Sequence, residues 1–325
     1  MKWSAICGII VQLEMIMGAY ILIISVIFTG GTIASKTDND TILLDKAPYE
    51  LLKGSYEDIT FKVYEPYFIL SEDADFEHLK KLSECVEEAA VDSDAVIITH
   101  GTDSLVYSSA YIGYIFSDAD IPIFFVSSGF PLDDKGANGK QNFDKAVELC
   151  KDRQNRGVYT IWYSDGRASV HPSVRLMRQS PYCDMLSSIG QVFSPPYSPI
   201  KAKDISPSIG RAVYLKAMPS MFYPELDHNV SGVLIECYHS GTLCSDKRFK
   251  DFVYHAKMLD IPVFTVGTGG RDSDYETVKN YKSLGVNMLP MASPDAMYIK
   301  LCFAISIGND IKEFMFTPYG GDFIE

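Results

Sequence analysis

The sequence has 325 residues, 47% of them hydrophobic and 22% charged, and its formal net charge at pH 7 is −13. This length is sufficient for two domains with large apolar cores. The acidic excess argues against a nucleic-acid partner, because such a surface needs clustered lysine and arginine. The 7 cysteines contain no Cys-x-x-Cys pair and the 6 histidines have no metal-ligand spacing. We therefore expect reduced thiols, no metal site and a cytoplasmic protein.

The first residues combine a basic start with an apolar run, as a secretory signal peptide does. Glu14 interrupts this run, and no small-residue cleavage site follows it. An uncharged stretch of about 20 residues, as a membrane helix requires, is also missing ahead of Gly30. We therefore expect no membrane segment, and we treat residues 1–17 as an N-terminal extension that is not part of the fold.

Short apolar runs rich in β-branched residues alternate along the chain with segments of helical periodicity. This alternation is typical of a parallel sheet covered by helices on both faces. The expected strands are 21–28, 95–99, 123–127, 158–162, 212–215, 233–236, 262–266 and 286–289. The expected helices are 76–90, 103–116, 140–150, 246–258, 275–284 and 294–306.

A proline-rich stretch, residues 191–210, interrupts the alternation and is predicted to be a linker. The sequence thus predicts an α/β protein with two domains. The parallel-sheet N-terminal domain would span residues 18–190, and a smaller α/β C-terminal domain would span residues 211–325.

The segment Thr29-Gly30-Gly31-Thr32 follows the first expected strand directly. Glycines allow positive φ angles and let a ligand approach the main chain. A hydroxyl placed just after them can act as a nucleophile if a neighbouring group removes its proton. The alternative is a simple turn with a solvated threonine. The segment is not a phosphate-binding loop, because it lacks both the Gly-Lys-Ser/Thr and the Gly-x-Gly-x-x-Gly pattern.

The segment His100-Gly101-Thr102-Asp103-Ser104 follows the second expected strand. Ligands of open parallel sheets bind outside the carboxyl ends of the strands, so this segment and Thr32 are expected at the same edge. Asp103 is suited to bind a substrate ammonium group and Thr102 to position a water molecule. The alternative for Asp103 is an ordinary helix cap. We expect His100 to be a packing residue, because a residue at the very end of a strand tends to point into the packed interior.

These two segments, TGGTIAS and ITHGTDSLVYSSA, resemble the signature sequences of the bacterial-type L-asparaginase/glutaminase family. The second contains Ser104 where threonine is commoner in the family. The stretches ILSEDADFEHL, IPIFFVSSGFP and GVNMLPMASPDAMYIKL are also similar to family sequences, and the resemblance covers roughly residues 18–310.

The resemblance implies hydrolysis of L-asparagine to L-aspartate and ammonia through a threonine acyl-enzyme, without a cofactor. Thr32 would attack the side-chain amide, beside Gly31, while main-chain N–H groups stabilise the oxyanion. Thr102 would assist the water, Asp103 would bind the α-amino group and Ser71 the α-carboxylate. The family is also the reason to expect a homodimer or homotetramer that binds a small amino-acid amide.

The chain departs from the family pattern in three ways. The tyrosine expected soon after the nucleophile is absent from residues 33–48, and Tyr49 is the first available. The family lysine is absent too, with Arg175 nearest to its place. Arginine can supply charge but cannot transfer a proton. Glu72 stands where the family commonly has a neutral side chain, and would favour a cationic group in the substrate site.

Both losses predict weakened catalysis, because each general acid–base group contributes about 10²–10⁴-fold. On this interpretation Arg175→Lys would raise the activity. One alternative is a family member that binds an amino acid without turnover. Another is the asparaginase-like subunit of a tRNA amidotransferase, which is less favoured because that subunit is expected to have an added tRNA-facing domain and because this chain is acidic.

Overall fold

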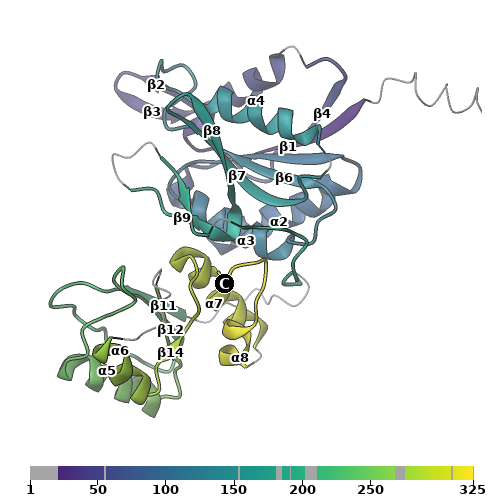
Figure 1. Cartoon of the computed structure of the whole chain (residues 1–325). Helices are drawn as coiled ribbons and strands as arrows, with labels where there is room; N and C mark the ends of the chain where they lie inside the picture. The colour runs from purple at the N-terminus through teal and green to yellow at the C-terminus, as the bar shows by residue number, and fades with distance from the viewer. Residues whose placement is uncertain are drawn as a thin grey trace, which may run out of the picture.

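The computed structural model describes residues 21–324 except 55, 153, 181–184, 191, 202–210, 268–274 and 309. It contains a six-stranded and a four-stranded sheet, each in its own domain (Figure 1). This arrangement confirms the predicted α/β class with a second, smaller α/β domain. The predicted extension, residues 1–17, lies outside the described residues, as does most of the second half of the predicted linker.

The N-terminal sheet has the strand order β4-β1-β5-β6-β7-β8. Its first five strands are parallel, and β8 is antiparallel to β7. Four of the six follow the apolar runs of the sequence closely. The strands are β1 (Leu22–Phe28), β4 (Ile59–Tyr64), β5 (Ala95–Thr99), β6 (Pro122–Val126), β7 (Gly157–Ser164) and β8 (Arg167–Pro172).

Helices cover both faces of this sheet. On one face α2 (Phe76–Val91) and α3 (Leu105–Ile115) pack against strand residues such as Ile27, Ile98 and Phe125. On the other face α4 (Gly139–Cys150) and the 3-10 helix η2 (Ala47–Lys53) pack against the alternate residues of the same strands. Burial on both faces is the reason why these strands are continuously apolar in the sequence.

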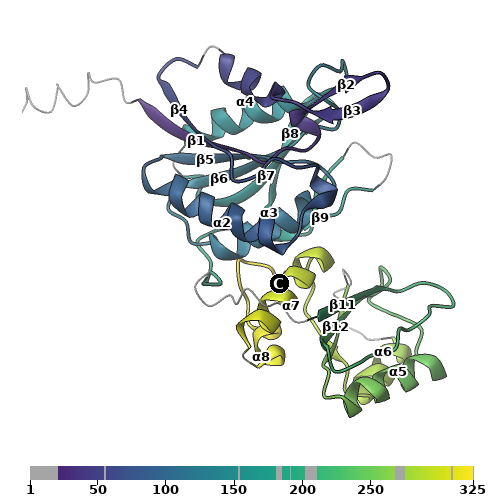
Figure 2. The ribbon, with the colours of Figure 1, turned by 180° about the vertical axis from the view of Figure 1, so that it is seen from behind.

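The C-terminal sheet consists of four parallel strands, β11 (Arg211–Lys216), β12 (Val230–Glu236), β13 (Val263–Val266) and β14 (Asn287–Met288). One face is covered by α5 (Lys247–Met258) and α6 (Glu276–Ser283). The other face packs on α7 (Pro294–Ile307), which also packs on α3 of the N-terminal domain. Seen from behind, α7 lies at the junction of the two domains, with the short α8 (Ile311–Phe316) beside it (Figure 2).

The sequence prediction missed the elements that lack a continuous apolar run. The edge strand β4 alternates between partly buried and exposed residues. The hairpin of β2 (Ser35–Asp38) and β3 (Thr41–Leu44) is largely exposed. Three further elements, β9 (Leu176–Met177), β10 (Ser187–Ser188) and α8, are very short. Within the described part of the chain, no helix has both the length and the apolar character needed to cross a membrane.

Candidate functional site

Three loops meet at the carboxyl edge of the N-terminal sheet, where β4, β1 and β5 are neighbours. Thr32 follows β1, Ser71 follows β4, and Thr102 and Asp103 follow β5. From the ends of β1 and β5 the chain continues to opposite sides, towards β4 and β6. Adjacent parallel strands whose connections diverge leave a crevice between them, which is the usual ligand site of such sheets. The candidate site therefore lies at the topological switch point.

The glycines of this site bring the three loops into main-chain contact. A Cβ atom built on Gly31 would lie 2.2 Å from the Cα atom of Gly101, and one built on Gly30 would lie 2.2 Å from the carbonyl oxygen of Ile69. Both Gly30 and Gly31 have positive φ angles, 97° and 76°. The sequence analysis predicts that these glycines let the substrate approach the main chain. The described contacts show that they also allow the loop backbones to pack closely.

Thr32 and Thr102 each follow a glycine of the Gly31–Gly101 contact. Thr32 begins a 3-10 turn, which is fixed because the Ala34 N–H and the Ser35 hydroxyl both donate to the Gly31 carbonyl, at 2.9 Å each. Both threonines are partly exposed. Within the described residues, neither threonine hydroxyl has a hydrogen-bond partner, so both hydroxyls are available to a substrate or a water molecule.

Ser71 and Asp103 form a reciprocal pair. The Ser71 hydroxyl accepts from the Asp103 N–H at 3.2 Å and donates to Asp103 Oδ2 at 3.3 Å. The Ser104 hydroxyl donates to the Ser71 carbonyl at 2.6 Å. Ser71 is buried whereas Asp103 and Glu72 are exposed. Ser71 thus uses its single proton on Asp103, and it would have to exchange this bond to bind a substrate carboxylate.

Ser104 and Gly101 are site residues that the sequence interpretation did not assign. A Cβ atom built on Gly101 would lie 2.4 Å from the Ser71 hydroxyl oxygen, so glycine is required for Ser71 to approach. In the sequence, Ser104 stands out only as a departure from the family pattern. Its position one residue after Asp103 was the available signal, since a hydroxyl before a helix commonly bonds to a neighbouring main-chain group.

His100 is a packing residue, as the sequence predicts. It is 2% exposed, and its Nδ1 donates to the Gly101 carbonyl at 2.8 Å. Burial lowers the pKa of its imidazole to about 4, so the ring is neutral at pH 7. The Thr29 hydroxyl donates to the Thr99 carbonyl at 2.8 Å and so ties the ends of β1 and β5 together.

Arg175 is not part of this group, contrary to the prediction that it stands in for the family lysine. Its guanidinium donates to the carbonyls of Gly321 at 2.7 Å and Phe323 at 3.2 Å, and also to that of Val192. Burial lowers the pKa of this guanidinium from its ordinary value. Its donors are thus engaged by the C-terminal tail and by Val192. No lysine or arginine among the described residues is ion-paired or hydrogen-bonded to Asp103.

Tyr49, the candidate to replace the family tyrosine, packs its ring on Phe28, with ring centroids 4.7 Å apart. The pKa of its hydroxyl is raised, mainly by partial burial and also by neighbouring Glu65. Glu65 directly follows β4, so the hydroxyl faces that edge strand. Among the described residues no hydrogen bond joins Tyr49 to Thr32, although η2, which contains Tyr49, packs near the 3-10 turn of Thr32.

The described residues contain no cluster of three or more histidine, cysteine, aspartate or glutamate side chains that could hold a metal ion. The candidate site consists instead of two hydroxyls, one carboxylate and main-chain groups. This set of groups is suited to acyl transfer to a hydroxyl, with a carboxylate that binds a cationic part of the substrate.

Comparison with known proteins agrees with this arrangement. The profile of the family described as asparaginase, N-terminal matches residues 23–182, which include all three loops of the site. The N-terminal domain belongs to the asparaginase family. Its structure superimposes on the thermostable L-asparaginase from Thermococcus kodakarensis with a TM-score of 0.74 and 18% identity, covering 94% of this chain and 100% of that one.

Two curated relatives are similar to this chain over different lengths. One component of the glutamyl-tRNA(Gln) amidotransferase of Thermoplasma acidophilum is 27% identical over 282 residues, 83% of this chain. The chain spans 64% of that relative's length. A protein of Deinococcus radiodurans described as "Probable L-asparaginase" is 28% identical over 144 residues, 44% of each chain.

Proposed function

We propose that this protein is an amidohydrolase that converts L-asparagine to L-aspartate and ammonia, with Thr32 as the nucleophile. The observation that carries the proposal is that two threonine hydroxyls without partners among the described residues follow the Gly31–Gly101 contact, next to the carboxylate of Asp103. Family membership and the position at the switch point of the sheet both support it.

The proposed reaction has two steps. The Thr32 hydroxyl attacks the side-chain amide carbon, and ammonia leaves with the proton that the hydroxyl gives up. A water positioned by Thr102 then cleaves the acyl-enzyme ester, releasing aspartate and restoring the hydroxyl. Main-chain N–H groups stabilise the oxyanion of both steps, and Asp103 binds the α-amino group of the substrate.

The substrate site is expected to be selective for a cationic group. We assign Asp103 and Glu72 as its two carboxylates, and Gly31 and Ser71 as further contacts of the substrate. Because Ser71 is already bonded to Asp103, its main contribution would be to hold that carboxylate in place. Among the described residues, no side chain is hydrogen-bonded to the Thr32 hydroxyl to accept its proton, so we expect slow turnover.

Ammonia release from asparagine, glutamine and simple amides tests the proposal. Wild-type protein should release ammonia, Thr32→Ala should lose this activity to background, and Thr37→Ala, a change at an exposed site on β2, should keep it. Equal activity of Thr32→Ala and wild type would refute the threonine mechanism. No ammonia from wild type, together with amino-acid binding that Asp103→Ala abolishes in calorimetry, would favour a family member that binds without turnover.

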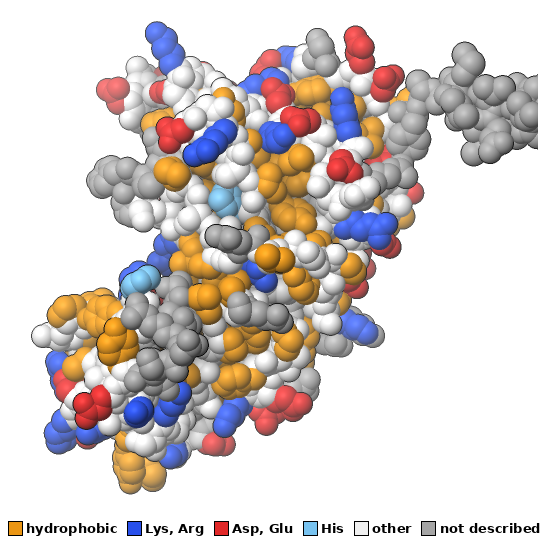
Figure 3. All heavy atoms as spheres, viewed as in Figure 1, with side chains coloured by type: hydrophobic (Ala, Val, Ile, Leu, Met, Phe, Trp, Pro, Cys, Tyr) orange, Lys and Arg blue, Asp and Glu red, His pale blue; other side chains and the backbone are white. Residues whose placement is uncertain are grey.

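A second candidate function is the ammonia-releasing part of a tRNA amidotransferase. It is favoured by the relatives named as components of glutamyl-tRNA(Gln) amidotransferase, one of which aligns with 83% of this chain. Against it, Lys and Arg side chains are scattered among acidic ones on the face shown in Figure 3, where the described residues form no continuous basic surface for tRNA. Glutamine hydrolysis that rises on addition of glutamyl-tRNA(Gln) would support this candidate over the first.

The assembly and the compartment are proposals as well. We infer a homodimer or homotetramer from the family resemblance, and a cytoplasmic location from the absence of disulfide-type cysteine spacing. Sedimentation of the full chain across a range of concentrations tests the first of these.

A further inference from the structure

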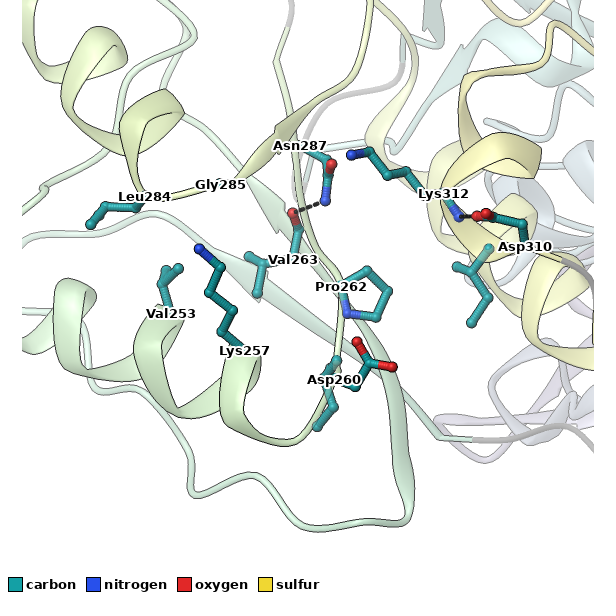
Figure 4. A pocket seen from close by; sticks show the side chains of 12 residues that line it. Val253, Lys257, Asp260, Pro262, Val263, Leu284, Gly285, Asn287, Asp310 and Lys312 are labelled. Carbon is teal, nitrogen blue, oxygen red and sulfur yellow. Dashed lines mark hydrogen bonds between the residues drawn. The ribbon is translucent and has the colours of Figure 1, made fainter.

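The C-terminal domain contains a cavity of about 450 Å³ that is separate from the candidate site (Figure 4). It opens at the amino ends of β13 and β14, between the end of α5 and the start of α8. None of its lining residues belongs to the N-terminal sheet. Cavities of this size commonly hold small molecules in proteins.

Two lysines enter this cavity from different walls. Lys257 extends from the last turn of α5 past Gly285, and a Cβ atom built on that glycine would lie 3.4 Å from Lys257 Nζ. Lys312 extends from the start of α8 towards Asn287 (Figure 4). The Asn287 side chain is itself fixed, because its Nδ2 donates to the Val263 carbonyl at 3.1 Å. The two ammonium groups therefore face one space across a fixed amide.

Neither ammonium group forms an ion pair with a carboxylate of the described residues. The chain has a net charge of −13, and Lys247, on the same helix as Lys257, does pair with Asp251 at 2.5 Å. Asp310 also lines the cavity, and its Oδ1 accepts from the main-chain N–H groups of Lys312 and Glu313 at the start of α8.

Stabilisation of helix ends does not explain both lysines. Lys257 lies in the last turn of α5, where a cation is favourable. Lys312, however, lies in the first turn of α8, where a cation opposes the helix dipole. A ligand with negative charge would explain both positions at once.

We propose that this cavity binds a small dianion, bearing either a phosphoryl group or two carboxylates, with Lys257 and Lys312 as its cationic contacts. Two cations on separate walls are better matched by a ligand with two negative charges than by a ligand with a single negative charge. The two carboxylates that line the cavity, Asp260 and Asp310, limit the affinity by repulsion. The binding does not depend on the amidohydrolase activity, so it can be measured without turnover.

Calorimetric titration of the full chain with inorganic phosphate and with succinate, at ionic strength matched with sodium chloride, tests the proposal. We expect saturable binding of at least one probe. Lys257→Ala and Lys312→Ala should each weaken it about threefold to fivefold, as is usual for exposed charge pairs. The control Lys250→Ala, an exposed lysine of α5 outside the cavity, should leave the affinity unchanged.

A fourth variant should act in the opposite direction. Asp260 has a φ of 57°, which asparagine tolerates well, so Asp260→Asn removes a negative charge without backbone strain. It should tighten binding of the same probe about threefold. Binding of phosphate alone or of succinate alone identifies which dianion chemistry fits. No saturable binding of either probe, an equal loss in Lys250→Ala, or weaker binding by Asp260→Asn would overturn the proposal.

Discussion

The candidate site and the region around the C-terminal tail are held together by opposite means. At the site, loops meet main chain to main chain through Gly30, Gly31 and Gly101. At the tail, residues 317–323 are bound by two buried cations, Arg175 and Lys300. The tail lies at the junction of the domains, where Figure 1 marks the C-terminus.

Lys300 is the more completely buried of these cations. Its side chain and that of Asp322 are both 0% exposed, and they pair at 2.7 Å. Lys300 also donates to the Thr317 carbonyl at 2.7 Å, and the Tyr114 hydroxyl donates to Asp322 at 3.2 Å. Burial lowers the pKa of the Lys300 ammonium and raises that of the Asp322 carboxyl, although each partner opposes the shift.

The difference shows where this fold places its buried positive charge. Both cations stabilise the tail, and the guanidinium of Arg175, which stands nearest in sequence to the family lysine, is directed away from the site. The site therefore retains hydroxyls and a carboxylate without a described cation. Its geometry depends on close backbone packing, whereas the tail depends on hydrogen bonds from Arg175 and on the ion pair of Lys300 with Asp322.

The largest effect is expected from Gly31→Ala. The added methyl would lie 2.2 Å from the Gly101 Cα atom, at a φ of 76°, so the loops must separate. We expect a loss of about 4 kcal/mol in the free energy of unfolding, measured with urea. The control is Gly166→Ala, with a similar φ of 77° but nothing within 4 Å, which should cost about 1 kcal/mol. Equal losses would mean that backbone strain, and not close packing, requires the glycine.

Breaking the buried pair at the tail should have the next largest effect. Lys300→Met leaves the Asp322 carboxylate buried without its partner, which costs about 3 kcal/mol. The double variant Lys300→Met, Asp322→Leu removes both charges and should recover part of the loss. Chemical denaturation of the three proteins measures this. A double variant less stable than Lys300→Met would show that the pair has no such role.

Arg175→Lys separates the structural role of this residue from a catalytic one. An ammonium cannot span the carbonyls of Gly321, Phe323 and Val192 at once, so we expect a loss of about 2 kcal/mol in unfolding free energy. Ammonia release per folded molecule should not rise. An increase would restore the sequence prediction that a lysine at this position serves catalysis.

The smallest effect is a pH dependence from His100. Its folded pKa of about 4 lies below the unfolded value of about 6.5, so the unfolded state binds more protons between these values. Stability is then fully present above pH 6.5 and falls as the pH drops through this window. From pH 7 to pH 5.5 we expect a loss of about 1 kcal/mol. The variant His100→Asn should show a smaller loss over the same range, and an identical loss would assign the effect elsewhere.

The sequence by itself determined the class of the fold and the loops of the site. Strands such as β1 and β5 are buried on both faces, so their apolar runs are visible without any structure. The parallel arrangement then places the residues after each run at one edge. Thr32, Thr102 and Asp103 could be proposed for this reason. Strand β4 was missed because its exposed edge removes that signal.

Only the tertiary structure decided what Arg175 and the glycines do. The partners of Arg175 lie up to 148 positions away in the sequence, and the contact of Gly31 with Gly101 spans two loops of different strands. A local pattern carries no information on such partners, because hydrogen-bond geometry and close backbone packing depend on which segments the fold brings together. The sequence therefore named the candidate nucleophile, and tertiary contacts alone showed that the nearest arginine is directed to the tail.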